Sequence, residues 1–293
     1  MPPGYRPIPL RSSARREKAV DTGRAFRLKI GMKRLLILAV FTLIAGMGVL
    51  WLIGVLWMDQ LIFHPPPPGY PAEEPYQFTA LSDGTRIAYR IWDNPRSDRV
   101  MVYSHGNAED MGNLEGIMPF YRDLGYTVVV YDYPGYGQSG GTPGVVGATD
   151  ALRRVVQTVS EDRNLRPEQL TMFGKSIGGG PATAVAAELP VGGLILESSF
   201  ASIFQVAFPS LRLPLDAFRN DARLTSVTCP VLIIHGTRDT VIDPLHANRL
   251  YAAANEPKRL LWVEGAGHND LLLKHGEDYV SVLRDFPRSV TEE

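Results

Sequence analysis

The sequence has few cysteines and no excess of charge of either sign. Its 293 residues include one cysteine, Cys229. This excludes a framework of internal disulfides and a cysteine-rich zinc site. Lysine and arginine number 30 against 31 aspartates and glutamates. A nucleic-acid-binding domain would need a basic face, so no nucleic-acid partner is expected. The length fits one large α/β domain or two small ones.

Charge is absent from one long apolar run, Leu35–Trp57. A helix of this length crosses a hydrocarbon core of about 30 Å. A cleavable signal peptide is the alternative, but its apolar region has about 7–15 residues and a small-residue cleavage site after it. We therefore predict a transmembrane anchor over residues 35–57.

The segment before the anchor, residues 1–34, is rich in lysine and arginine and lacks apolar periodicity. It is expected to be a basic, disordered tail. Because basic flanks stay in the cytoplasm, we predict a cytoplasmic N-terminus and a domain on the extracytoplasmic side, the periplasm in a bacterium. Met32, which precedes Lys33 and Arg34, is a hypothetical alternative start of translation.

The segment after the anchor, residues 58–75, contains four consecutive prolines. Such a run favours an extended polyproline II spacer. Packing of Tyr70 and Tyr76 on the domain is the alternative. We expect a catalytic domain over residues 76–285 and a C-terminal tail over residues 286–293.

Short β-branched runs then alternate with helical patterns. This alternation predicts an α/β fold, a mostly parallel sheet with helices on both faces, and an antiparallel hairpin at its edge. Strands are expected at 76–81, 86–92, 100–104, 127–132, 170–173, 193–197, 231–235 and 260–263, and helices at 113–124, 146–160, 177–188, 244–254 and 276–285.

One connection is longer than a helical crossover needs to be. The part from Phe200 to Phe218 is rich in apolar residues. It predicts a small cap over about residues 200–228 that lines an acyl-binding pocket. A crossover with ordinary core residues is the alternative.

The stretch after the fifth predicted strand carries reactive chemistry. Residues 174–178 read Gly-Lys-Ser-Ile-Gly, which fits the G-x-S-x-G nucleophile elbow. The glycines leave room for a sharp strand-to-helix turn at Ser176. A phosphate-binding P-loop is excluded, because that motif would need glycine where Gln169 stands. Lys175 is expected to be a solvent-facing charge.

A serine nucleophile needs a base and a carboxylate that orients the base. Asp239 follows one predicted strand end and His268 follows the next, which gives the order Ser, Asp, His. Glu197 and Asp243 are the alternative acids. Among the other histidines, His235 is expected to bond the backbone and His105 to hold its loop, and three are expected at the surface: His64, His246 and His275.

The oxyanion of such a reaction needs two backbone N–H donors. Ile177 directly follows the nucleophile at a helix start and is expected to supply one. Asn107, in the loop after the third predicted strand, is expected to supply the other.

Five blocks together resemble one branch of the α/β-hydrolases: residues 104–108, 131–137, 174–178, 232–239 and 262–269. That branch contains membrane-associated α/β-hydrolase-domain proteins, including acyl-protein thioesterases that remove palmitate. The resemblance covers about residues 60–285 and implies a hydrolase with the triad Ser176, Asp239 and His268. The depalmitoylating members attach through an N-terminal cysteine cluster, where this chain has residues 35–57 instead, so the resemblance does not extend to protein depalmitoylation.

The sequence thus predicts a single-pass, membrane-anchored serine hydrolase for carboxylic esters or thioesters of acyl or lipid-like substrates. The chemistry needs no metal or organic cofactor. A peptidase or amidase that uses the same triad is one alternative. A tethered, hydrolase-like binding domain without turnover is the other.

Overall fold

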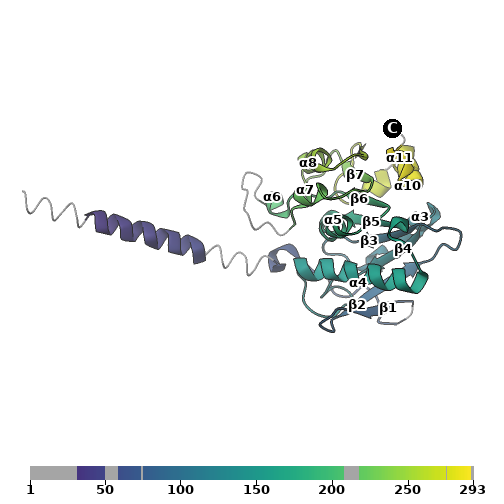
Figure 1. The fold of residues 1–293 in the computed structure, drawn as a ribbon, viewed down its shortest axis with the longest axis horizontal. Helices are drawn as coiled ribbons and strands as arrows, with labels where there is room; N and C mark the ends of the chain where they lie inside the picture. Colours follow the sequence, from purple (N-terminus) through teal and green to yellow (C-terminus); the bar gives the residue numbers. More distant parts are fainter. Residues whose placement is uncertain (1–31, 50–58, 74, 208–217, 275, 292–293) are drawn as a thin grey trace, which may run out of the picture. The chain divides into compact units, whose positions relative to one another are not determined.

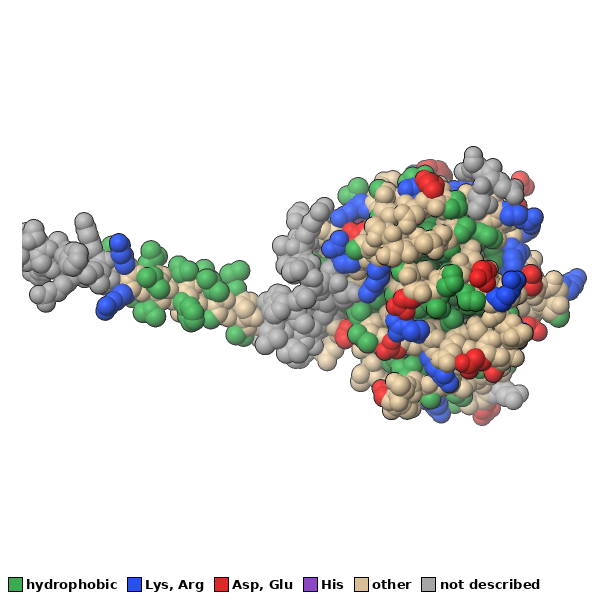
Figure 2. Space-filling view, viewed as in Figure 1, with side chains coloured by type: hydrophobic (Ala, Val, Ile, Leu, Met, Phe, Trp, Pro, Cys, Tyr) green, Lys and Arg blue, Asp and Glu red, His purple; other side chains and the backbone are tan. Residues whose placement is uncertain are grey.

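The computed structural model describes residues 32–49, 59–73, 75–207, 218–274 and 276–291. The chain divides into two compact units, residues 1–57 and 58–293. In the first unit, Met32–Val49 is a helix long and apolar enough to cross a membrane, and its residues are exposed. Figure 2 shows apolar side chains around this helix and basic ones at its start. The predicted tail up to residue 31 and the anchor residues 50–57 lie outside the described residues.

The second unit is built on one sheet (Figure 1). Its strand order is β1-β2-β4-β3-β5-β6-β7-β8. The pairs β1–β2 and β2–β4 are antiparallel, and the other pairs are parallel. The predicted parallel sheet with an antiparallel edge is therefore confirmed. The strands are β1 Gln77–Ala80, β2 Arg86–Trp92, β3 Val100–Ser104, β4 Thr127–Tyr131, β5 Leu170–Lys175, β6 Gly193–Glu197, β7 Val231–Gly236 and β8 Lys258–Val263.

Helices cover both faces of the sheet, which explains why the central strands are apolar throughout. In β3, Val100 and Val102 enter one buried cluster, whereas Met101 and Tyr103 enter the other, because successive side chains point to opposite faces. The first cluster contains residues of α4 Val145–Arg163, α5 Gly179–Glu188 and α8 Leu245–Ala253, and the second contains residues of α2 Met111–Leu114, α3 Met118–Asp123 and α10 Glu277–Asp285.

The predicted helix over residues 113–124 is wrong as one element, because the structure has two helices there, α2 and α3. Pro119 lies in the first turn of α3. Proline lacks an N–H and is tolerated only in the first turn of a helix, so a helix running through this position is disfavoured.

Both ends of the catalytic unit extend beyond the predicted bounds. The segment expected as a spacer packs on the domain, since Phe63 and Tyr70 are buried. This matches the alternative that we considered for Tyr70 and Tyr76. The tail predicted over residues 286–293 is wrong for its first part, because Phe286 and Val290 are buried and α11 Arg288–Thr291 follows. Both side chains belong to the second buried cluster, which no local sequence pattern indicates.

The predicted cap lies partly outside the described residues, which omit 208–217. Its described parts include α6 Ile203–Ala207 and α7 Asn220–Leu224. Phe200 and Phe218 are fully buried, with ring centroids 6.4 Å apart. An added Cβ on Gly180 of α5 would lie 2.5 Å from the Phe218 ring. These two aromatics therefore belong to the core and do not line a pocket.

Candidate active site

The nucleophile candidate sits at the junction of β5 and α5. Ser176 has a left-handed backbone with φ of +53° and starts the 3-10 helix η2 Ser176–Gly178. An added Cβ on Gly174 would lie 2.5 Å from the Gly179 Cα, and one on Gly178 would lie 2.0 Å from the Ser104 carbonyl oxygen. The flanking glycines are therefore needed, because the backbone returns on itself at this turn. A left-handed non-glycine residue costs about 1–3 kcal/mol and typically marks a functional site.

Three predicted residues meet at the carboxyl edge of the sheet. His268 Nε2 lies 3.0 Å from Ser176 Oγ, and His268 Nδ1 lies 2.8 Å from Asp239 Oδ2. The serine is at the end of β5, the aspartate follows β7 and the histidine follows β8. The parallel strands all end at this edge, so residues far apart in sequence come into hydrogen-bonding distance. The arrangement can carry a proton from the serine to the imidazole.

The Asp239 carboxylate is held as an anion. Its Oδ1 accepts the N–H groups of Val241 and Ile242 at 2.9 and 2.8 Å. Burial alone would raise the pKa of Asp239, but the bonds from His235, His268 and the Ile242 N–H outweigh it and hold this pKa well below its usual range. A buried carboxylate of this kind can orient His268 and stabilise its charged form.

The alternative acids are bonded elsewhere. Glu197 Oε2 accepts the Tyr279 hydroxyl at 2.5 Å. Burial raises the pKa of this carboxyl group. Asp243 Oδ1 accepts the Leu245 N–H at 2.8 Å at the start of α8. Neither acid is bonded to His268 among the described contacts.

Of the remaining histidines, His235 and His64 lie as predicted and His246 does not. His235 Nε2 lies 3.0 Å from the Ile242 carbonyl oxygen, as predicted, and also 3.3 Å from Asp239 Oδ2, which the sequence did not indicate. His64 is exposed. His246 was expected at the surface, but it is buried and its Nδ1 accepts the Ala201 N–H at 3.2 Å. Helical position alone could not show that the segment around Ala201 contacts it. His275 lies outside the described residues.

The loop after β3 lies directly beside the nucleophile turn. An added Cβ on Gly178 would also lie 2.8 Å from the His105 carbonyl oxygen. Ile177, as the second residue of η2, has an N–H that needs no helical acceptor. The loop and the turn thus bring the two predicted oxyanion residues, Asn107 and Ile177, to the same edge of the sheet. Their role as donors stays a prediction.

Three tyrosine hydroxyls hold this loop from the β4 side. Tyr131 and Ser104 share a hydrogen bond of 2.9 Å. Tyr133 donates to the His105 carbonyl at 2.6 Å and Tyr136 donates to Asn107 Oδ1 at 2.7 Å. These tyrosines belong to the block at 131–137. This block contributed to the family resemblance, but the resemblance did not indicate what its tyrosines do. His105 itself is buried, with Nε2 3.4 Å from Asp132 Oδ1, as expected of a structural histidine.

Lys175 was expected to face solvent, but it forms an ion pair. Its Nζ lies 3.0 Å from Glu109 Oε1, and the two side chains are only 15% and 18% exposed. The same Glu109 oxygen accepts the Gly106 N–H at 2.7 Å. An added Cβ on Gly106 would lie 2.3 Å from this oxygen, so a larger residue there would displace the Glu109 carboxylate. The ion pair therefore ties the β3 loop to the residue before the nucleophile.

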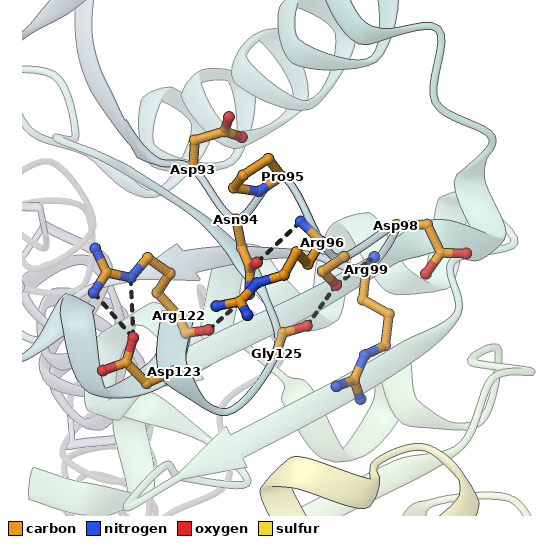
Figure 3. Close-up of a pocket in the computed structure, with 10 residues that line it drawn as sticks. Asp93, Asn94, Pro95, Arg96, Asp98, Arg99, Arg122, Asp123 and Gly125 are labelled. Atoms are coloured by element: carbon orange, nitrogen blue, oxygen red, sulfur yellow. Dashed lines mark hydrogen bonds and ion pairs between the residues drawn. The ribbon is translucent and has the colours of Figure 1, made fainter.

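A separate polar hollow lies at the opposite end of the sheet, before β3 and β4 (Figure 3). Its volume is about 700 Å³. The Arg122 guanidinium binds Asp123, and the Arg99 guanidinium donates to the carbonyl groups of residues 124, 284 and 286. These arginines join loops, and the hollow is far from Ser176.

A mostly parallel sheet with a serine on a left-handed strand-to-helix turn defines an α/β-hydrolase. Comparisons with known proteins agree. The sequence model of a family described as serine aminopeptidase, S33, matches residues 95–220. Human alpha/beta hydrolase domain-containing protein 17B is 37% identical over 215 residues, which cover 71% of this chain and 73% of the human protein. Mouse protein 17C is 36% identical over 198 residues, covering 66% of this chain and 60% of its own length.

Solved structures are similar in fold. A Pyrococcus furiosus esterase has a TM-score of 0.62 at 20% identity, over 76% of this chain and 98% of its own. The esterase domain of a Rhodothermus marinus protein has a TM-score of 0.54 at 19% identity, over 72% and 94%. The chain therefore belongs to the α/β-hydrolase superfamily, in its branch of membrane-associated alpha/beta hydrolase domain-containing proteins.

Proposed function

We propose that the chain is a membrane-anchored serine hydrolase that cleaves carboxylic ester or thioester bonds of acyl or lipid-like substrates. The observation that carries this proposal is the hydrogen-bonded series Ser176, His268, Asp239, with distances of 3.0 and 2.8 Å. The left-handed turn that exposes the serine supports it. The esterase function of the Pyrococcus furiosus neighbour agrees with it.

The geometry suggests the following steps. His268 takes the proton of Ser176 Oγ while this oxygen attacks the acyl carbon, and the N–H groups of Asn107 and Ile177 bind the resulting oxyanion. The tetrahedral intermediate collapses, and the leaving alcohol or thiol takes the proton from His268. Water then attacks the acyl-enzyme, gives a proton to His268, and releases the acid as the proton returns to the serine.

The proposed membrane location rests on two features of the chain. The helix Met32–Val49 could serve as the anchor, and Lys33 near its start favours a cytoplasmic N-terminus with the domain on the extracytoplasmic side. In the second unit, the most exposed large apolar side chains of the described residues lie in two kinds of segment. Four of them follow the carboxyl ends of β4, β7 and β8, and the fifth lies in the segment that is hydrogen-bonded to the start of α4 through Asp59. They are Leu61, Val146, Val241, Leu245 and Leu273, with exposed fractions of 56–86%.

These apolar side chains lie at the same edge as Ser176, which suits a substrate presented at a bilayer surface. Leu273 lies in the short helix α9 Leu271–Lys274, which follows the His268 loop, and is 86% exposed. We expect Leu273→Asp to lower hydrolysis of an acyl ester embedded in phosphatidylcholine vesicles several-fold. Its hydrolysis of the soluble ester p-nitrophenyl acetate should stay at the wild-type level. Equal losses on both substrates would contradict the bilayer part of the proposal.

A fluorophosphonate probe tests the enzyme claim on the full chain. We expect it to label Ser176, and Ser176→Ala to abolish labelling and ester hydrolysis while the melting temperature stays near that of the wild type. A series of p-nitrophenyl esters of increasing acyl length then measures how deep the acyl site is. Folded wild-type protein that is not labelled would favour a tethered binding domain without turnover.

A peptidase or amidase is the second candidate, and the family match at residues 95–220, described as a serine aminopeptidase, favours it. The same triad cleaves amides on related folds. Comparing p-nitrophenyl esters with aminoacyl p-nitroanilides separates the two. A higher kcat/KM on the anilides would replace the esterase proposal.

A further inference from the structure

The segment that leads from the anchor into the domain, residues 59–71, is here called the strap. It is built into the domain. Phe63 is 3% exposed and packs edge-on against Tyr133 and Tyr136, with ring centroids 6.3 Å away in both cases. Asp59 Oδ1 accepts the Val145 N–H at the start of α4. The strap therefore has a fixed path across this part of the domain.

At its far end the strap is fastened to the segment beyond the β3 loop. The Gly69 N–H donates to Asp110 Oδ2 at 2.6 Å, and the buried Tyr70 hydroxyl donates to Asp132. Asp132 also accepts the Met111 N–H at 3.0 Å. The strap thus crosses the β3 loop and is hydrogen-bonded to the domain at both of its ends.

Between these ends the strap encloses the side chain of Asn107. The His64 N–H donates to Asn107 Oδ1 at 2.9 Å, and Asn107 Nδ2 donates to the Ile62 carbonyl at 2.5 Å. Tyr136 donates a third bond, to Oδ1, at 2.7 Å, and the His64 N–H also reaches the Tyr136 hydroxyl at 2.9 Å. Both polar atoms of the carboxamide are therefore bonded to the protein itself, and these bonds hold the Asn107 side chain in place.

An oxyanion donor is effective only when it is held in place before the charge develops. The next residue, Ala108, has a left-handed backbone with φ of +55°, a conformation that a free loop seldom adopts. Fixing the Asn107 carboxamide at two atoms restricts the backbone on which its N–H lies. The bonds to this carboxamide described above come from two parts of the chain, the strap and the β4 loop.

We propose that His64, through its backbone N–H, and Tyr136 are positioning residues for the Asn107 N–H in the oxyanion site. The segment that joins the anchor to the domain thereby supports catalysis in addition to attachment. This inference rests on the proposed function. It predicts that weakening the strap lowers the rate of the acylation step and leaves substrate binding unchanged.

The first test compares two tyrosines in the full chain. Tyr136→Phe removes the bond to Asn107. Tyr126→Phe is the matched control, because its buried hydroxyl donates to the Leu283 carbonyl at 2.8 Å, at the other end of β4. Loss of a whole oxyanion donor costs about 10²–10³ in kcat, so a displaced donor should cost about tenfold. We expect Tyr136→Phe to lower kcat on p-nitrophenyl butyrate about tenfold at constant KM, and the control to keep its kcat.

The second test removes the strap's own donor. His64→Pro deletes the N–H to Asn107 and should lower kcat more than His64→Ala, which keeps this N–H. Because both changes act through the same carboxamide, they should be non-additive. In an Asn107→Ala background, adding Tyr136→Phe or His64→Pro should lower kcat by less than about twofold. Melting temperatures measured on each variant separate this effect from loss of fold.

Fluorophosphonate labelling of Ser176 separates failure of this inference from failure of the proposed function. If the wild type is labelled but Tyr136→Phe and Tyr126→Phe have the same kcat, the positioning role is wrong and the hydrolase proposal stands. If Tyr136→Phe still lowered kcat about tenfold in the Asn107→Ala background, this result would also overturn the positioning role. A wild type that is not labelled overturns both.

Discussion

Two neighbouring strands of the sheet, β6 and β7, each lead to an acid near His268, yet the two acids differ in state. Glu197 ends β6 and Asp239 follows β7, and both are buried. Burial raises the pKa of Glu197, and its main partner is a tyrosine hydroxyl. The pKa of Asp239 is low in spite of burial, because two backbone N–H groups and two imidazoles face it.

Position at a strand end thus brings an acid to the site, while burial raises its pKa and the hydrogen-bond donors around it lower this pKa. Glu197 lies in register with Lys175 on β5, and this lysine lowers the pKa of Glu197, but its ion pair is with Glu109. Glu197 is thus left with a neutral partner, Tyr279. Glu197 is bonded to Tyr279, whereas Asp239 Oδ2 lies 2.8 Å from His268 Nδ1, so of these two acids Asp239 is the one placed to orient the imidazole.

The largest expected effect comes from the anionic acid. Asp239→Asn should lower kcat about 10⁴-fold, because the amide favours the wrong tautomer of His268. Glu197→Gln is the matched variant on the neighbouring strand. The test compares the kcat of both variants on p-nitrophenyl butyrate and uses circular dichroism to check that each variant is folded. Comparable losses in the two variants, or retained activity in Asp239→Asn, would erase the distinction between the two strand ends.

A smaller effect is expected from the ion pair between Lys175, at the end of β5, and Glu109, in the loop after β3. Lys175→Met should lower kcat about tenfold, since Glu109 then loses its partner and the Gly106 bond to it loosens. Lys258→Met is the matched control, because the Lys258 side chain is also 15% exposed but lies at the start of β8. Equal kcat values for the two variants would show that the ion pair does not support the β3 loop.

The sequence predicted the meeting of Ser176, Asp239 and His268 because each follows an apolar run, and parallel strands end at a common edge. It could not predict contacts set by packing between remote segments. Asn107 donates to the Ile62 carbonyl across 45 residues of sequence, and the buried His246 accepts the N–H of Ala201, also 45 residues away. Such contacts leave no periodic signal, so the sequence left the packing of the spacer open and did not predict the burial of Phe286 or His246. The raised pKa of Glu197 was equally hidden, because it comes from burial, and the hydrogen-bond partner of Glu197 is Tyr279, 82 residues later.

The smallest expected effect is on stability, and its sign differs between the two acids. The raised pKa of Glu197 means that the unfolded chain ionises first, so folding stability is lost as pH rises above the usual value of about 4.3. The lowered pKa of Asp239 means that its contribution to folding stability is fully present above about 3.9 and is lost as pH falls toward the folded value.

Glu197→Gln should therefore have a higher melting temperature than the wild type, and the difference should grow as pH rises from about pH 4 to about pH 7. Asp239→Asn should be less stable than the wild type at pH 7, with the deficit narrowing in acid. Thermal unfolding of the three proteins from about pH 2 to about pH 7 measures both slopes, and slopes of the same sign would mean that the pKa values of the two acids are shifted in the same direction.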